Sequence, residues 1–210
     1  MAFEPGKPEV VATCGGKFIC VFHLNTGELR LKYEHNEGDQ DFYCLAWTCL
    51  QRRNFLASGS NLGEIRLFDL NRKVSFYSWT YKKTAAINAV QFHSEEPSWL
   101  FTASNVRREI FVFSLTHNIL QDGIISLWDI GSPNPPRYLE MEHTKLIELE
   151  LERRNKDLYC MAWVGDNGAG MIMVGTMDGL MGWRISSERV KEERFGSYQP
   201  QMIEFRYLES

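Results

Sequence analysis

Residues 42–70, FYCLAWTCLQRRNFLASGSNLGEIRLFDL, alternate short apolar runs with the turn residues that separate them. The first run carries a small residue followed by an aromatic one, Ala46-Trp47, and the last ends in Phe68-Asp69-Leu70. Short runs rich in β-branched and aromatic residues, bounded by Gly, Asn, Asp and Ser, are typical of β-strands. The stretch therefore predicts short strands joined by tight turns.

The same unit occurs several times along the chain. Each copy has a strand with an aromatic residue near its end, then a small and polar run with Gly, then a second strand with an aromatic end. The other copies are INAVQFH (87–93) with LFTASN (100–105) and DGIISLWDI (122–130), LYCMAWV (158–164) with IMVGTMDGLMGWRI (172–185), and the partial copy VVATCGGKFICVFHL (10–24). Almost no 3.6-residue periodicity accompanies them, so the sequence predicts an all-β fold built from repeats.

These repeats resemble the WD40 family. The residues that carry the resemblance are Leu127-Trp128-Asp129-Ile130, Leu67-Phe68-Asp69-Leu70 and Gly182-Trp183-Arg184-Ile185. Four-stranded WD40 blades span roughly 40 to 45 residues, and Phe22 lies 46 residues before Phe68. The resemblance implies a WD40 β-propeller, with Trp47, Trp128, Trp163 and Trp183 as core residues at repeated positions.

Chain length limits how much of a propeller can be present. Seven blades need roughly 280 to 300 residues, whereas the chain has 210. We expect residues 1–210 to form a partial WD40 β-propeller of about four blades plus the start of a fifth, RFGSYQPQMIEFRYL (194–208), of an expected seven. Because an open propeller leaves blade faces uncovered, we expect it to be marginally stable in isolation.

One copy is longer than the others. Trp47 precedes Phe68 by 21 residues and Trp163 precedes Trp183 by 20, whereas the equivalent interval from Phe92 to Trp128 is 36 residues. Removing residues 106–121, VRREIFVFSLTHNILQ, shortens that interval to 20 and aligns FTASN/DGIISLWDI with LASGSN/LGEIRLFDL without a gap. Residues 106–121 therefore form an anomalous insertion.

Two explanations for the insertion remain open. Its centre, IFVFSL, is more apolar than a propeller loop usually is. A retained short intron fits, since Val106-Arg107 can be encoded by a sequence opening GTAAG and Gln121 by CAG; a true extra hairpin or strand on the blade edge is the alternative. We expect low order in the insertion and assign it no functional site.

Composition favours a protein-binding module over other classes. The formal net charge is −4, and phosphate binding depends on Lys and Arg, so no strong direct nucleic-acid binding is expected. No run of roughly 18 apolar residues that could cross a membrane is present, and no membrane partner is expected. The five cysteines lack the pairing of a zinc site and are expected to be buried thiols in a reducing compartment.

The sequence shows no recognisable arrangement of catalytic or cofactor-binding residues, so we expect no enzymatic activity, no metal and no cofactor. Gly15-Gly16-Lys17 lacks the spacing of a phosphate-binding loop. The carboxylates of EGDQD (37–41) lack the order of a calcium loop and are expected in a solvated loop. The histidines are scattered, and we expect ordinary surface or turn positions for them: His23, His35, His93, His117 and His143.

A narrower resemblance extends over most of residues 2–140. The strings AFEP, VATCGG, CVFHLNTGELRLKYEH, DFYCLAWT, LFTAS and LWDIGSPN resemble the propeller of the leucine-rich repeat and WD repeat-containing proteins that associate with the origin recognition complex. WRISSERV (183–190) is similar to the embryonic ectoderm development subunit of Polycomb repressive complex 2, more distantly. Both resemblances imply readers of trimethylated lysine on repressive histone tails, located on chromatin in the nucleus.

The resemblance also implies site residues and partners. In the Polycomb subunit an aromatic residue of a trimethyl-lysine cage matches Tyr43, and Phe42 is the neighbouring candidate; packing at the blade top is the alternative for both. Family cage aromatics that precede Met1 or follow Ser210 are expected outside this sequence. The implied partners are histone H3 or H4 tail peptides with trimethyl-lysine and origin recognition complex subunits; the alternative is a generic WD40 scaffold in another complex.

Overall fold

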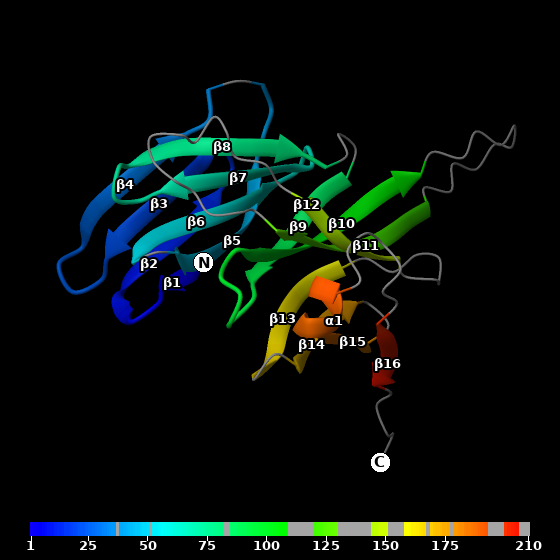
Figure 1. Cartoon of the computed structure of the whole chain (residues 1–210). Coiled ribbons are helices and arrows are strands. Elements are labelled where there is room, and N and C mark those ends of the chain that lie inside the picture. The colour runs from blue at the N-terminus through cyan, green and yellow to red at the C-terminus, as the bar shows by residue number, and fades with distance from the viewer. Residues whose placement is uncertain are drawn as a thin grey trace, which may run out of the picture.

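A computed structural model describes residues 1–36, 38–50, 52–81, 85–108, 120–129, 144–150, 158–166, 169–176, 179–192 and 200–205. Most of them lie in β-strands (Figure 1). The elements are β1 (Ala2–Glu4), β2 (Lys7–Gly15), β3 (Phe18–His23), β4 (Glu28–Glu34), β5 (Phe42–Leu50), β6 (Arg53–Ser60), β7 (Glu64–Asp69), β8 (Val74–Thr80), β9 (Ala85–Phe92), β10 (Trp99–Arg108), β11 (Leu120–Asp129), β12 (Thr144–Glu150), β13 (Leu158–Asp166), β14 (Ala169–Thr176), β15 (Gly179–Ser186), α1 (Ser187–Glu192) and β16 (Gln201–Phe205). No helix among the described residues is long and apolar enough to cross a membrane.

The strands form four antiparallel sheets of four strands each, and each sheet follows chain order: β1 to β4, β5 to β8, β9 to β12 and β13 to β16. Each sheet contains one of the sequence repeats, so the predicted all-β, WD40-type architecture of blades is confirmed. The repeat at residues 10–24 is more than a partial copy, because β1 and β4 complete its sheet. The first strands of the second, third and fourth sheets are inner strands, because β9 packs against both β5 and β13.

The expected start of a fifth blade is wrong in its placement. β16, which lies within RFGSYQPQMIEFRYL, pairs antiparallel with β15 from Leu180↔Phe205 to Arg184↔Gln201 and so completes the fourth sheet. The repeat count missed this because α1 and residues 193–199 separate β16 from β15, so that the outer strand looks like a new unit in the sequence. The described strands therefore make four blades.

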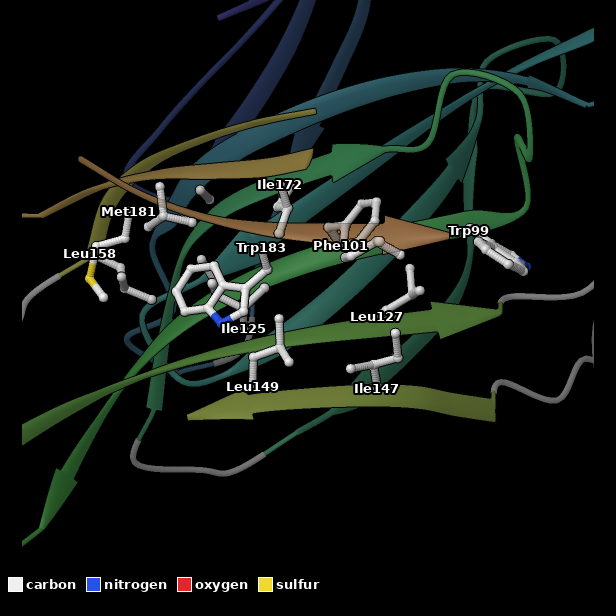
Figure 2. Packing of buried hydrophobic residues seen from close by; sticks show 14 of the residues in the cluster. Trp99, Phe101, Ile125, Leu127, Ile147, Leu149, Leu158, Ile172, Met181 and Trp183 are labelled. Atoms are coloured by element: carbon white, nitrogen blue, oxygen red, sulfur yellow. The ribbon is translucent and has the colours of Figure 1, made fainter. Parts of the chain in front are cut away.

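Apolar residues from neighbouring sheets pack together between the blades. Trp99, Phe101, Ile125 and Leu127 of the third sheet meet Trp183 and its neighbours in the fourth (Figure 2). A second cluster joins the second sheet to the third and a third joins the first to the second. Trp47, Trp128 and Trp183 are buried and Trp163 is partly buried against the core, as predicted for repeated core positions.

The Trp-Asp copy makes a hydrogen bond that its neighbour cannot make. Trp128 Nε1 donates to Thr102 Oγ1 at 3.0 Å in the third blade. At the same positions of the second blade stand Phe68, which has no donor, and Ser58, whose buried hydroxyl has no hydrogen-bond partner. An unpaired buried hydroxyl costs stability, so the second blade relies on apolar packing where the third also uses a hydrogen bond.

Gly59 allows the second blade to approach the third closely. A Cβ at this position would lie 2.4 Å from Ile87 Cγ2 and 2.8 Å from Cys44 Sγ. Ile87 belongs to the inner strand of the next blade and is fully buried. The absence of a side chain at Gly59 therefore sets the spacing between two blades.

We predict that Gly59→Ala lowers the free energy of unfolding by about 1–3 kcal/mol, because the added methyl group overpacks the interface with Ile87. Urea unfolding followed by circular dichroism measures the change. Gly15→Ala is the matched control, since a Cβ there meets nothing within 4 Å. Equal stability for the two variants would contradict the packing of β6 against β9.

The insertion lies beyond the tip of the β10–β11 hairpin. Ala103 pairs with Ile125 and Ser104 with Ile124, which matches the pairing of Gly59 with Ile65 in the second blade. Three pairs from the inserted residues continue the ladder, from Val106↔Asp122 to Arg108↔Leu120. The ends of the insertion thus prolong β10 and β11, as a true extra hairpin would. The low order expected for residues 106–121 is not found at residues 106–108 and 120–121, which are paired strand residues. Residues 109–119 lie outside the described part, and the intron explanation stays a hypothesis.

We predict that deleting residues 106–121 preserves the fold and changes the free energy of unfolding by only about 1 kcal/mol, because the ladder up to Ser104↔Ile124 is untouched and shortening a loop has a small entropic effect. Circular dichroism and urea unfolding of the deletion variant test this. Loss of cooperative unfolding would show instead that the insertion is an integral part of the blade.

Candidate functional site

Tyr43 lies at the point where the loop after the first blade enters β5. Three backbone contacts fix this entrance: Phe42 N donates to Gly16 O at 2.8 Å, Asp41 N to Asn61 Oδ1 at 2.9 Å, and Asn61 N to Asp41 O at 2.9 Å. Asn61 Nδ2 also donates to Asp39 O at 3.0 Å. The loop is therefore held against the β2–β3 and β6–β7 turns, and the start of β5 is pre-organised.

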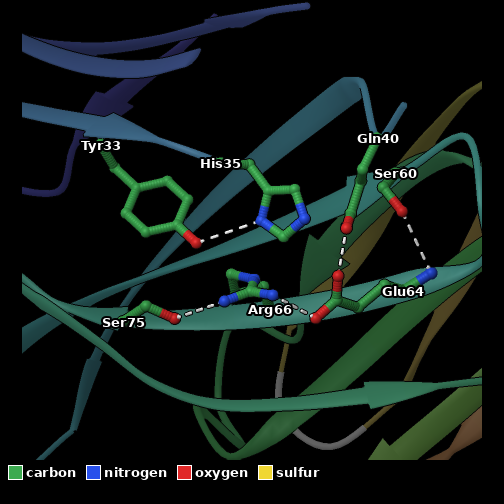
Figure 3. A network of polar contacts seen from close by, with 7 residues as sticks. All are labelled: Tyr33, His35, Gln40, Ser60, Glu64, Arg66 and Ser75. Carbon is green, nitrogen blue, oxygen red and sulfur yellow. Dashed lines mark hydrogen bonds and ion pairs between the residues drawn. The ribbon is translucent and has the colours of Figure 1, made fainter. Parts of the chain in front are cut away.

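A polar network supports the same entrance (Figure 3). Gln40 Nε2 donates to Glu64, and Glu64 accepts from Arg66 Nη2 at 2.6 Å. Arg66 also lies over the ring of Tyr33, 5.6 Å from its centroid. Tyr33 is in turn hydrogen-bonded to His35 Nδ1 at 3.4 Å. The network joins the outer strand of the first blade to the third strand of the second, which fixes the approach of the loop to Tyr43.

The two aromatic candidates occupy different environments. Phe42 is 2% exposed, and its ring lies edge-on to Tyr33 and His35 at 6.0 and 6.1 Å. Tyr43 is 53% exposed. Phe42 is therefore a packing residue at the blade interface and cannot offer a ring face to a ligand, whereas Tyr43 can; a role for Tyr43 in methyl-lysine binding stays a prediction.

A β-bulge explains why consecutive residues differ so much. Phe42 pairs with Ser60 and Cys44 pairs with Gly59, so Tyr43 is an extra residue with no partner on β6. A bulge bends its strand and re-aims the extra side chain. It leaves Phe42 in the core while turning Tyr43 outward.

The inner strands of the next two blades carry the same bulge. Ile87 pairs with Ser104 and Ala89 with Ala103, which leaves Asn88 as the extra residue of β9. In β13, Leu158 pairs with Thr176 and Cys160 with Gly175, which leaves Tyr159. We call Tyr43, Asn88 and Tyr159 the bulge row.

Tyr159 is the residue that the sequence reasoning missed. It is 56% exposed, while the preceding Leu158 is fully buried, which repeats the pattern of Phe42 and Tyr43. The signal was available in the alignment of LYCMAWV with FYCLAWT, where Tyr159 falls on Tyr43. The family resemblance fades in this part of the chain and assigns no role to Tyr159.

Other candidate sites do not assemble. No group of three or more potential metal ligands occurs among the residues that the structure describes. His35 and His93 are buried rather than at the surface, because His35 joins the polar network and His93 Nδ1 accepts from the backbone NH groups of Glu95 and Glu96. His117 and His143 lie outside the described residues. Of EGDQD, Glu37 is outside them too, and Asp39 is exposed.

A hollow at the opposite end of the first two blades is lined by Glu4, Lys7, Arg30, Trp47, Asn54 and Lys73, among others. Glu4 is buried there, but Lys7 Nζ and Asn54 Nδ2 both donate to its carboxylate, at 2.8 and 2.6 Å. The buried charge is therefore satisfied within the protein, and the hollow needs no ligand to balance it.

The cysteines are all free thiols, but the expected burial holds for only some of them. Cys49 and Cys160 are exposed. Burial raises the pKa of the Cys44 thiol to about 12. Although Cys44 as a residue is partly accessible, its sulfur donates to Ile87 O at 3.4 Å and closely approaches Gly59.

We predict that thiol reagents at pH 8 modify Cys49 and Cys160 in the native protein and leave Cys44 unmodified until the protein unfolds, since the thiolate is the nucleophile. Above about pH 9 the unfolded thiol ionises while the folded one stays protonated, so Cys44 should lower stability as pH rises further. Mass spectrometry of labelled protein checks the first part. The second part is tested by measuring the free energy of unfolding as a function of pH. It should fall more steeply for the native sequence than for Cys44→Ala, and parallel curves would contradict this.

The chain is similar to curated proteins named leucine-rich repeat and WD repeat-containing protein 1. The Xenopus tropicalis protein is 33% identical over 147 residues, which cover 63% of this chain and 18% of that protein. The mouse and human proteins are each 27% identical over 92% of this chain, which corresponds to 29% and 28% of their own lengths. No family model matches the chain.

These similarities confirm the predicted resemblance to leucine-rich repeat and WD repeat-containing proteins, and the resemblance to the Polycomb subunit stays a prediction. The chain spans less than a third of the length of these curated relatives. Similarity to WD-repeat proteins, together with the four blades, indicates a protein–protein interaction module.

Proposed function

We propose that this module reads histone tails: that it binds histone H3 or H4 peptides bearing trimethyl-lysine through Tyr43, and that it associates with origin recognition complex subunits on chromatin in the nucleus. The observation that carries the proposal is the exposed ring of Tyr43, held on a pre-organised entrance to β5. The similarity of the chain to leucine-rich repeat and WD repeat-containing protein 1 supports a WD-repeat binding module. The choice of histone tails and origin recognition complex subunits as partners follows from the resemblance carried by the sequence.

The chemistry of this binding is a cation–π interaction. A quaternary ammonium group is attracted to the negative face of an aromatic ring, and each such contact contributes about 0.5–2 kcal/mol. Asp39 is exposed and Asp41 is partly exposed, and both precede Tyr43 by a few residues. Their negative charges favour the approach of a basic peptide such as a histone tail.

The module is proposed to act by binding alone, without catalysing a reaction and without a cofactor. Activated nucleophiles and bases have pKa values shifted towards their task. Desolvation instead raises the pKa of the partly buried Cys14 thiol and of the Cys44 thiol, which makes both less reactive at neutral pH. The described residues therefore offer surfaces for binding rather than activated groups for catalysis.

A generic WD40 scaffold is the second candidate function. It is favoured by one observation, that of the two predicted cage residues only Tyr43 exposes its ring. One ring cannot surround an ammonium group. A scaffold would bind its partner through the same face with no preference for methylation.

We predict that the chain binds trimethyl-lysine histone peptides more tightly than the unmodified peptides, and that Tyr43→Ala weakens the methylated complex by about 2- to 30-fold, the loss of one cation–π contact. Tyr43→Phe should retain most of the affinity because it keeps the ring. Isothermal titration calorimetry with H3 and H4 peptides measures both, and Val74→Ala, at an exposed position on β8, is the control. Equal affinity for methylated and unmodified peptides would remove the reader function and leave the scaffold.

A further inference from the structure

We propose that Tyr159 supplies the second ring, so that the bulge row of Tyr43, Asn88 and Tyr159 is one binding site for a trimethylammonium group. The inference rests on the proposed function, since it concerns the same class of ligand. It goes beyond that function by placing both aromatic rings of the site on inner strands of this chain, in the second and the fourth blade.

Hydrogen bonds between the inner strands connect the three bulges in sequence. Cys44, which follows Tyr43, donates its Sγ hydrogen to Ile87 O at 3.4 Å, and Ile87 precedes Asn88. Asn88 Nδ2 then donates to Leu158 O at 3.0 Å, and Leu158 precedes Tyr159. The bulges are therefore neighbours along one edge of the blades, at the same end of β5, β9 and β13.

A further contact fixes the position of Tyr159. Leu158 N donates to Asn105 Oδ1 at 3.1 Å, which ties the start of β13 to the β10–β11 hairpin. Leu158 itself is fully buried. Leu158, the residue before Tyr159, is thus anchored to the neighbouring blade, and a pre-organised site loses less entropy on binding.

Neither tyrosine is needed for the apolar core. Their exposed fractions are 53% and 56%, and the preceding residues, Phe42 and Leu158, already fill the interior positions at 2% and 0%. The sequence therefore places a buried apolar residue and an exposed tyrosine at the same bulge twice. Large exposed rings at repeated, rigid positions are suited to contact a partner.

The composition of the row selects the charge of the ligand. Two phenol rings offer negative faces, and the residue between them, Asn88, is neutral. No lysine or arginine belongs to the row, and Asp39 and Asp41 lie on the loop before Tyr43. A bulky organic cation such as trimethyl-lysine matches these features, because its charge is spread over methyl groups that contact rings without needing hydrogen bonds.

The test measures binding of four peptides to the native chain and to Tyr159→Ala and Tyr159→Phe by calorimetry. The peptides are a trimethyl-lysine histone H3 peptide, a scrambled peptide with the same trimethyl-lysine, the unmodified H3 peptide, and an H3 peptide in which the charged nitrogen is replaced by carbon. Val164→Ala, at a 59% exposed position on the same strand, is the control for effects on β13.

The expected result is a loss of about 2- to 30-fold for both trimethylated peptides with Tyr159→Ala, near-native binding with Tyr159→Phe and Val164→Ala, and weaker binding of the uncharged analogue. Unchanged binding in Tyr159→Ala, with Tyr43→Ala still weakened, would overturn the row and leave the proposed reader intact. Tight binding of the scrambled trimethylated peptide would support the row and contradict histone specificity. No preference for trimethyl-lysine in the native chain would overturn both.

Discussion

Each four-stranded sheet in this chain must bury its faces against the next sheet, because a single blade has too few residues to enclose a core of its own. The apolar clusters accordingly lie between sheets, with residues such as Trp128 and Trp183 at matching positions of the repeat. The spacing of the blades follows from this packing. At Gly59 it is so close that β6 has no room for a side chain against Ile87.

The same packing determines what the inner strands can present. Near the start of β5, β9 and β13 a bulge interrupts the pairing with the next strand, so one residue faces the core and the next faces outward. Hydrogen bonds between the strands then hold the outward residues in a fixed order around one edge. A site built from Tyr43 and Tyr159 therefore depends on the packing between blades rather than on loop conformation, and weakening that packing should weaken binding even where no binding residue is changed.

Much of the fold could be predicted from the sequence, because aromatic residues recur at equivalent positions of the repeat, as in Phe22 and Phe68, and so reveal the period and hence the blades. The placement of β16 could not, since a helix and a connecting segment separate it from its partner and only the backbone pairing with β15 assigns it. For the site, resemblance matched a cage aromatic to Tyr43 but could not show that the neighbouring candidate, Phe42, is buried. Burial differs between these two neighbours because of a bulge, and a bulge leaves no mark in composition or in local periodicity. Tyr159 was visible only by aligning the chain with itself.

The insertion illustrates a related limit. An even number of added residues at a hairpin tip leaves the pairing of the blade unchanged, which is why Ala103↔Ile125 matches Gly59↔Ile65 despite 16 extra residues. The length of the insertion alone therefore does not distinguish a retained intron from a true hairpin. The fold tolerates either one.

The central claim is that two tyrosines from separate blades face one ligand. Nuclear magnetic resonance of the chain with isotope-labelled tyrosine rings, assigned by Tyr43→Phe and Tyr159→Phe, tests it most directly during titration with a trimethyl-lysine H3 peptide. The account predicts that the ring signals of Tyr43 and Tyr159 shift together with one dissociation constant, while the signal of Tyr33, in the polar network, does not. Shifts confined to Tyr43, or to neither residue of the pair, would contradict it.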